Sequence, residues 1–394
     1  MGKDRQKDKM SGIYIHIPFC ERKCIYCDFY SIEKLGWIDS FVDSVLREIE
    51  IFKKESDFTE TSCFDTIYFG GGTPSLLKVS QVEKILNSLY KNFQISPNAE
   101  VTIEANPGTV DKEKLFSFKE VGINRLSFGV QSFFDEDLKF LGRIHTSKDA
   151  IECVKFAFEA GFENINIDLI FGLPGQSVKD WVKNLHKAIE LGVPHISAYN
   201  LIVEKGTPLY ELVRNDKVKL PDENEQAEMY EMTMETLEGA GYIHYEVSNY
   251  AHEGFECRHN LKYWEYENYI GFGPSAHSFW VNKRWWNVAN LDKYLRAIGL
   301  DKLPIANFEI LDSEKMMEEF IYLGLRSTGI DLNKFRAKFG FDFLDAEIRE
   351  ELNELEKLGF VEVDNFKVKL TRKGFSVCDE ISVNLISKIK YVSR

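Results

Sequence analysis

Six short apolar runs, each followed by a helical stretch, most constrain what this chain can fold into. Helical periodicity fills the intervals between them, as over 79–92 and 178–191. Strands joined by crossover helices of this length run parallel, with right-handed connections. The sequence therefore predicts an α/β fold on a parallel sheet. The candidate strands are Ile13–Ile17, Phe64–Phe69, Glu100–Glu104, Asn124–Gly129, Asn164–Ile170 and His195–Leu201.

Six such units fit an incomplete parallel (β/α)6 barrel, in which functional groups gather at the C-terminal strand ends. A flat, doubly wound sheet is the alternative, but no G-x-G-x-x-G follows the first candidate strand. Beyond residue 300 the pattern changes. Helical stretches at Ser313–Leu325, Asp331–Phe339 and Asp345–Leu358 precede an alternating segment that turns at Asp364-Asn365. Helices followed by a small hairpin predict a C-terminal helical, winged-helix-like domain.

We therefore divide the chain into four parts: a disordered tail at 1–10, the barrel at 11–220, an extension of the barrel at 221–300 and the C-terminal domain at 301–394. The first ten residues lack the apolar segment of a signal peptide, and no apolar run is long enough to form a transmembrane segment. Four of the seven cysteines are scattered singly, as in a reducing compartment. We expect a cytoplasmic protein.

The net charge of −14 argues against broad binding to nucleic acid. A DNA-binding regulator is the alternative that this acidity opposes. Its support is a small basic patch in the C-terminal part, made of Lys367, Lys369, Arg372 and Lys373.

Three cysteines, Cys20, Cys24 and Cys27, follow the first candidate strand with the spacing C-x₃-C-x₂-C. An ordinary iron–sulfur cluster takes four protein thiolates. A cluster held by three keeps one iron open for a further ligand. A zinc site with His16 as the fourth ligand is an alternative, although strand alternation points His16 away from its neighbours. A disulfide is a weaker alternative, because nothing marks the chain as secreted.

Further polar groups follow the next strands. The segment Gly70–Pro74 lets backbone N–H and C=O groups approach a ligand closely. The lack of a G-K-[ST] sequence argues against a phosphate loop, whereas a simple tight turn remains an alternative. Glu104 ends the third strand, where a carboxylate could accept hydrogen bonds from ribose hydroxyls. Gln131, Arg143 and Asp168 follow or end later strands, so a barrel would bring them together.

Together these segments resemble the oxygen-independent coproporphyrinogen III oxidase (HemN-like) family of the radical S-adenosylmethionine (SAM) superfamily. The resemblance rests on 15–20, 70–74, 129–132 and 168–174, and it covers roughly 11–279. It implies a [4Fe–4S] cluster on Cys20, Cys24 and Cys27 whose open iron chelates SAM, which an electron then cleaves to a 5′-deoxyadenosyl radical. By position, the SAM contacts fall on Tyr14, Gly71, Gly72, Thr73, Glu104, Gln131, Arg143 and Asp168.

Two departures make the chain similar to a heme-chaperone branch of that family. The oxidase has a fourth cysteine two residues after the third, where this chain has Phe29, and a longer N-terminal extension. The H-N-x-x-Y-W signature of the chaperone branch matches His259–Trp264. The resemblance implies that the chain binds heme and passes it to an acceptor protein, with flavodoxin or ferredoxin as a candidate electron donor. Radical decarboxylation of porphyrinogen propionates is the alternative, so enzymatic activity stays open.

His259 is the candidate heme ligand, because imidazole binds heme iron. Two further ligand types, Cys257 and His277, lie close in the sequence. The alternative makes His259 a hydrogen-bonded structural group and the surrounding aromatic residues part of the core that closes the barrel. As an apolar slot for a flat macrocycle, the same aromatic set would be Tyr263, Trp264, Tyr266, Phe272 and Trp280.

Overall fold

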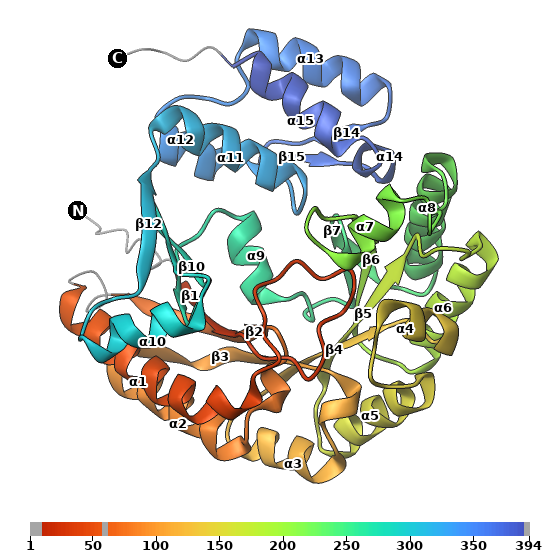
Figure 1. Ribbon diagram of the computed structural model, residues 1–394. Helices are drawn as coiled ribbons and strands as arrows, with labels where there is room; N and C mark the ends of the chain where they lie inside the picture. Colours follow the sequence, from red (N-terminus) through yellow and green to blue (C-terminus); the bar gives the residue numbers. More distant parts are fainter. Residues whose placement is uncertain (1–9, 57–61, 390–394) are drawn as a thin grey trace.

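The computed structural model describes residues 10–56 and 62–389 and confirms the predicted fold class (Figure 1). All six predicted strands are present and pair in parallel in chain order. Of the predicted tail at 1–10, only Met10 lies within the described residues. The strands are β1 (Ser11–Ile17), β2 (Cys63–Gly71), β3 (Gln94–Ala105), β4 (Arg125–Gln131), β5 (Asn164–Phe171) and β6 (His195–Asn200).

Amphipathic helices cover the outer face of the curved sheet (Figure 1). In α1 (Ile38–Glu55), Phe41, Val45 and Ile49 are buried and the charged residues face mainly outward. Two short helices, α4 (Asp135–Leu141) and α7 (Pro208–Arg214), were not predicted. The remaining outer helices are α2 (Val79–Asn92), α3 (Lys112–Glu120), α5 (Ser147–Glu159) and α6 (Val178–Glu190).

Six further strands extend the sheet to twelve, and the sequence analysis missed them all. Next to β6 lies β8 (Asn249–Ala251), which is antiparallel to it, and β7 (Ile243–Glu246) pairs antiparallel with β8 at the edge of the sheet. On the other edge, β9 (Tyr269–Phe272) runs parallel to β1. Strands β10 (His277–Trp280), β11 (Lys283–Asn287) and β12 (Ile305–Ile310) continue that edge in antiparallel order. Strand β12 thus pairs with the large sheet, although the sequence analysis assigned its residues to the C-terminal domain.

Three helices interleave with these strands. Helix α8 (Glu223–Gly239) packs against α6, and α10 (Leu291–Gly299) packs against α1. Helix α9 (Arg258–Trp264) lies inside the ring of strands and contacts β1 and β2 (Figure 1). The interior of the barrel is therefore filled from one end by a helix.

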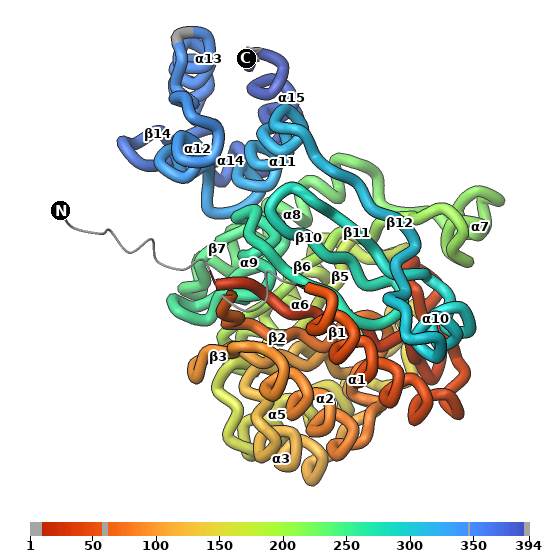
Figure 2. Tube along the Cα trace, turned by 90° about the vertical axis from the view of Figure 1, so that its left-hand side faces the viewer, coloured from red at the N-terminus to blue at the C-terminus, as the bar shows by residue number. Residues whose placement is uncertain are grey.

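The C-terminal part forms a helical unit with its own small sheet. Its predicted helices are α11 (Ser313–Leu325), α12 (Leu332–Phe339) and α13 (Ala346–Lys357). The predicted hairpin is β14 (Val361–Val363) with β15 (Lys367–Leu370), and β13 (Ile330–Asp331) pairs on the other side of β15. Helices α14 (Arg372–Phe375) and α15 (Cys378–Ser387) complete the unit, which stands to one side of the barrel (Figure 2). The fourfold division of the chain remains a prediction.

Among the described residues, no helix combines the length and the apolar composition needed to cross a membrane.

Candidate metal and cofactor site

A cavity of about 440 Å³ lies at the C-terminal ends of the barrel strands, beneath the loop that joins β1 to α1. This loop crosses the barrel mouth in Figure 1. Side chains from the loop and from β2 to β6 line the cavity. They include all three loop cysteines and seven of the eight residues to which the resemblance assigned SAM contacts, namely Gly71, Gly72, Thr73, Glu104, Gln131, Arg143 and Asp168.

Backbone hydrogen bonds hold the cysteine loop in place. Phe19 and Ile32 form a β-bridge that closes the loop at its base. The N–H of Cys20 donates to the carbonyl of Ile32 over 3.0 Å, and the N–H of Ile32 donates to Pro18 over 2.8 Å. The N–H of Leu209 donates to Ile25 over 2.9 Å, which ties the loop to the start of α7. The three thiols therefore project into the cavity from an anchored loop.

The thiols lie close enough to influence one another. Burial is the main cause that raises the pKa of Cys27 to about 11, and the nearby negative charges of Cys24 and Cys20 contribute to this rise. The guanidinium of Arg143 donates to Cys24 Sγ over 3.4 Å. Bound metal ions deprotonate coordinating thiols, so a cationic cluster would stabilise three thiolates that otherwise repel one another.

The zinc alternative finds no support in the position of His16. Its Nε2 bonds to the carbonyl oxygen of Tyr30 over 2.9 Å, and its Nδ1 bonds to Tyr14 Oη over 3.2 Å. Both ring nitrogens are thus occupied away from the cysteines. Within 10–56 and 62–389, no three histidine, cysteine or carboxylate side chains converge on one point as a single metal ion requires. A four-iron cluster takes each thiolate on a different iron, which suits more widely spaced sulfurs.

The glycine segment after β2 approaches the cysteine loop too closely for side chains. Gly71 has φ of +113°, and a Cβ on Gly72 would lie 2.6 Å from the carbonyl oxygen of Phe19. The N–H groups of Gly71, Gly72 and Thr73 donate to Glu104, Ile17 and Phe19. The expectation of unblocked N–H groups was therefore wrong, because these amides attach the segment to β1 and β3. Its carbonyl oxygens are the groups that can meet a ligand.

Two partly buried carboxyl groups face the cavity from β3 and β5. Burial first, and then the nearby charge of Asp168, raise the pKa of Glu104 to about 7. Glu104 Oε1 accepts from Tyr68 over 2.9 Å, and Oε2 accepts from the N–H of Gly71 over 3.2 Å. Asp168 accepts from Asn166 over 2.8 Å, and burial also raises its pKa. Each carboxylate keeps lone pairs for a ligand with hydroxyl or cationic groups.

Gln131 and Arg143 show the features of a site built for a ligand. Gln131 ends β4 with φ of +70°, in the left-handed region that non-glycine residues rarely adopt, after a bulge in the strand. Strained backbone of this kind clusters at functional sites. Arg143 donates to the carbonyl of Gly129 over 2.5 Å, yet its buried Nε has no hydrogen-bond partner among the described residues.

Tyr14 is the predicted SAM contact that the structure does not bring to the cavity wall. Its ring packs on Tyr68 and His259, with centroids 6.2 and 6.3 Å away. The side chain therefore lies one layer deeper in the barrel. The sequence analysis also missed Tyr26, Tyr199 and Asn200, which line the cavity. The rule that functional groups gather at the C-terminal ends of barrel strands, called the strand-end rule below, could have found Tyr199 and Asn200, since both end β6.

His259 lies in α9, where it is fully buried and fully hydrogen-bonded. Its Nδ1 bonds to Thr66 Oγ1 over 2.8 Å, and its Nε2 bonds to Tyr263 Oη over 2.8 Å. Its ring stacks on Tyr68 with centroids 5.1 Å apart. In this conformation both ring nitrogens are engaged by protein groups, so the structure does not support the prediction that His259 is a heme ligand. Cys257 is equally inaccessible, and its thiol points to Glu100.

Three of the five aromatic residues predicted to form a slot pack into or against the hydrophobic core instead. Tyr266 and Phe272 are buried members of the hydrophobic core, and Trp280 packs against it. Tyr263 fills the space beside His259. The aromatic residues of this segment therefore close the barrel, as the alternative interpretation held.

Comparisons with known proteins agree with this architecture. Residues 14–188 match the family model of the radical SAM superfamily, and residues 311–377 match that of the HemN C-terminal domain. The chain is 38% identical over 377 residues to the heme chaperone HemW of Bacillus subtilis (strain 168), which covers 94% of this chain and 98% of the relative. It is 40% identical over 268 residues to HemW of Escherichia coli (strain K12), which covers 68% and 69%.

Among solved structures, coproporphyrinogen III oxidase (HemN) from Escherichia coli superimposes with a TM-score of 0.82 at 24% sequence identity. The match covers 96% of this chain and 91% of the oxidase. At this level of identity the likeness demonstrates a shared fold and nothing about the reaction.

Proposed function

Because the chain belongs to the HemW family of heme chaperones within the radical SAM superfamily, we propose that it binds heme and delivers it to an acceptor protein. The observation that carries this proposal is the 38% identity that spans 98% of a HemW relative. The heme-chaperone branch inferred from the missing cysteine and from the H-N-x-x-Y-W segment agrees with that relationship. The acceptor is not identified. We also propose that the protein is cytoplasmic and that flavodoxin or ferredoxin is its electron donor.

Family membership implies a [4Fe–4S] cluster and SAM, and the cavity at the barrel mouth fits both groups. Three thiols enter it from one anchored loop, and the buried Arg143 Nε lacks a partner among the described residues. We propose that Cys20, Cys24 and Cys27 hold the cluster. When bound, the cluster supplies an open iron that chelates SAM and an electron that can cleave the sulfonium.

Different groups of the cavity suit different parts of the SAM molecule. The carbonyl oxygens of Gly71 and Gly72 suit its amino group, and the guanidinium of Arg143 suits its carboxylate. Glu104 has lone pairs for the two ribose hydroxyls. Asp168 supplies a negative charge that favours the positively charged sulfonium. These assignments follow from the chemistry of each group.

The oxidase alternative draws no specific support. The position of the oxidase's fourth cysteine is occupied by Phe29, whose side chain is exposed at the rim of the cavity. The structural likeness to the oxidase extends to the fold alone.

The test is an anaerobic heme titration of three forms of the full chain. Reconstituted wild-type protein should contain about four irons and four sulfides per chain and bind about one heme. A variant with Cys20, Cys24 and Cys27 all changed to alanine should contain no cluster. Cys63→Ser, which lies outside the loop, should retain it. Heme should then pass from wild-type protein to an added heme-free acceptor.

Two results would contradict the proposal. Wild-type protein that binds no heme, with or without its cluster, would remove the chaperone function. Protoporphyrinogen formed from coproporphyrinogen, SAM and a reductant would establish the oxidase in its place.

A further inference from the structure

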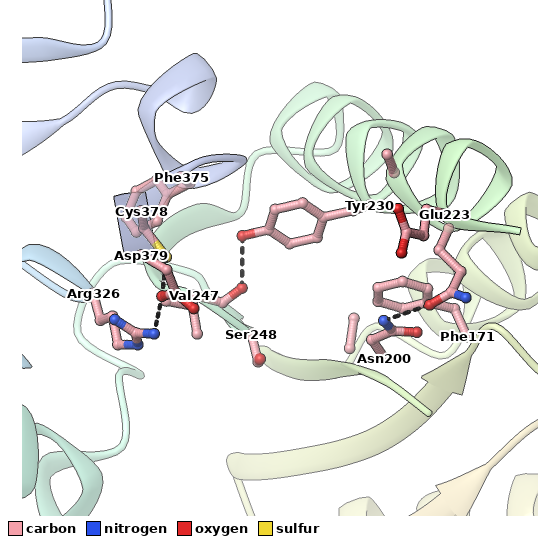
Figure 3. Close-up of a pocket in the computed structure, with 13 residues that line it drawn as sticks. Phe171, Asn200, Glu223, Tyr230, Val247, Ser248, Arg326, Phe375, Cys378 and Asp379 are labelled. Carbon is pink, nitrogen blue, oxygen red and sulfur yellow. Dashed lines mark hydrogen bonds and ion pairs between the residues drawn. The ribbon is translucent and has the colours of Figure 1, made fainter. Parts of the chain in front are cut away.

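A second cavity of about 460 Å³ lies between the barrel and the C-terminal unit (Figure 3). The ends of β5 and β6 and the first turns of α8 form one wall. The turn between β7 and β8, the end of α11 and the start of α15 form the other. This interdomain cleft opens beside the cluster cavity, and Asn200 lines both.

The walls of the interdomain cleft are mainly aromatic and apolar. Phe171 and Tyr230 stack nearly parallel, with centroids 6.3 Å apart and planes 19° apart, on the barrel side. Phe375 closes the opposite side, where it packs on His244. Ala227 of α8 also lines the cleft, and its small side chain leaves space that a larger one would fill. Broad ring faces and small side chains suit a flat apolar ligand.

Three polar residues of the C-terminal unit line this space: Arg326, Cys378 and Asp379. Cys378 is the first residue of α15, and its half-buried thiol lies 3.4 Å from Asp379 Oδ1. Arg326 also bonds to Asp379, but its buried Nη1 has no hydrogen-bond partner among the described residues. Thiolate is an established ligand of heme iron, and guanidinium pairs with carboxylates. Glu223, the other carboxylate on the lining, is exposed at the rim.

The other candidate places for heme are occupied by protein or by the expected cofactors. His259 and its aromatic neighbours form a filled core. The cluster cavity has a volume of about 440 Å³, which is in the usual range for a site that holds one small ligand. The cluster and SAM together would occupy it. Heme therefore needs a site that is separate from the cluster cavity.

We propose that the interdomain cleft is the heme site. The macrocycle lies between the Phe171–Tyr230 pair and Phe375, Cys378 Sγ binds the iron, and Arg326 pairs with a propionate. This inference rests on the proposed chaperone function and adds the location and the ligand. A site between two packed units also suits a cargo that must leave, because separation of the units would open it.

The experiment compares heme binding to full-length variants that retain the cluster. Ala227→Trp fills the interdomain cleft and should weaken heme binding by about tenfold or more. Glu228→Trp places the same side chain on the solvent face of α8 and should bind as wild type does. Cys378→Ser should abolish the thiolate signature in the heme absorption spectrum. It should leave the binding of iron-free protoporphyrin unchanged, because the walls remain.

The outcomes separate this inference from the proposed function. If wild-type protein binds heme and Ala227→Trp binds it equally well, the cleft is not the site and the chaperone function stands. A heme spectrum that Cys378→Ser leaves intact, or that His259→Gln alone alters, overturns the assignment of the ligand. Wild-type protein that binds no heme removes both.

Discussion

Glu104 illustrates how one buried residue can make cofactor binding depend on pH. Its carboxyl group lies in a wall that it shares with Asp168, and both burial and that neighbour disfavour the charged form. With a pKa of about 7 instead of its usual 4.5, Glu104 holds a proton at pH 6 and loses it by pH 8. Only the ionised group offers both oxygens as acceptors to ribose hydroxyls.

We therefore predict that SAM binds more tightly as pH rises through 7. Between pH 6 and pH 8 the ionised fraction of Glu104 increases about tenfold, so the affinity should rise by a similar factor. Anaerobic calorimetry on the cluster-loaded protein would measure it. Glu104→Gln should weaken binding and reduce this rise, and what remains would report titration of SAM itself. An equally steep pH profile in Glu104→Gln would show that another group titrates.

Single residues were predictable where the strand-end rule applied to them. Glu104, Gln131 and Asp168 share a cavity because parallel strands bring their C-terminal ends together. His259 could not be placed by that rule, since it lies on a helix whose position depends on contacts with distant strands. Its sequence neighbours suggested a ligand, but Thr66 and Tyr263 occupy both ring nitrogens.

At the scale of elements, buried ion pairs attach α9 to the barrel near the start of β2. Lys262 Nζ lies 2.7 Å from Asp65 Oδ1 and 3.4 Å from Glu267, with only 6% of its side chain exposed. Arg258 of the same helix reaches the other oxygen of Asp65 at 2.8 Å. One carboxylate of β2 thus pairs with two cations of α9. Without it, Lys262 would keep a hydrogen bond to the carbonyl oxygen of Met10 and, as its only remaining carboxylate partner, the more distant Glu267.

Asp65→Ala should therefore destabilise the protein by about 3 kcal/mol, because it leaves a buried ammonium group poorly paired. Lys262→Met should cost less, since Arg258 still pairs with Asp65 and the apolar chain fills similar space. Urea denaturation of each variant would measure both losses. Glu190→Ala, which breaks an exposed ion pair with Lys187, should cost below about 0.5 kcal/mol. A loss for Asp65→Ala as small as that control would show that this ion pair does not hold α9.

Long periodic elements were predictable, and short ones were not. The range Val79–Asn92 was predicted for α2 with both ends correct, because its apolar stripe has a clear helical period. Strands β7 to β12 have three to six residues each, too few to show an alternation. Their pairing depends on edges that β1 and β6 present only after the barrel has formed.

At the scale of the whole molecule, the end of β6 connects the two cavities. Tyr199 and Asn200 line the cluster cavity, and Asn200 also lines the interdomain cleft, where its Nδ2 donates to Gln226 Oε1 over 2.8 Å. A ligand in either cavity therefore contacts a wall that the other shares. Ordering of this wall by a first ligand lowers the entropic cost of binding the second.

We accordingly predict that SAM strengthens heme binding by about threefold or more in the cluster-loaded protein. Because such coupling is reciprocal, heme should raise the affinity for SAM by the same factor. Heme titrations with and without saturating SAM would measure it. Asn200→Ala, which removes the contact with Gln226, should reduce the factor toward one. The sign of the effect is decisive, since weaker heme binding in the presence of SAM would mean that both ligands compete for the cluster cavity.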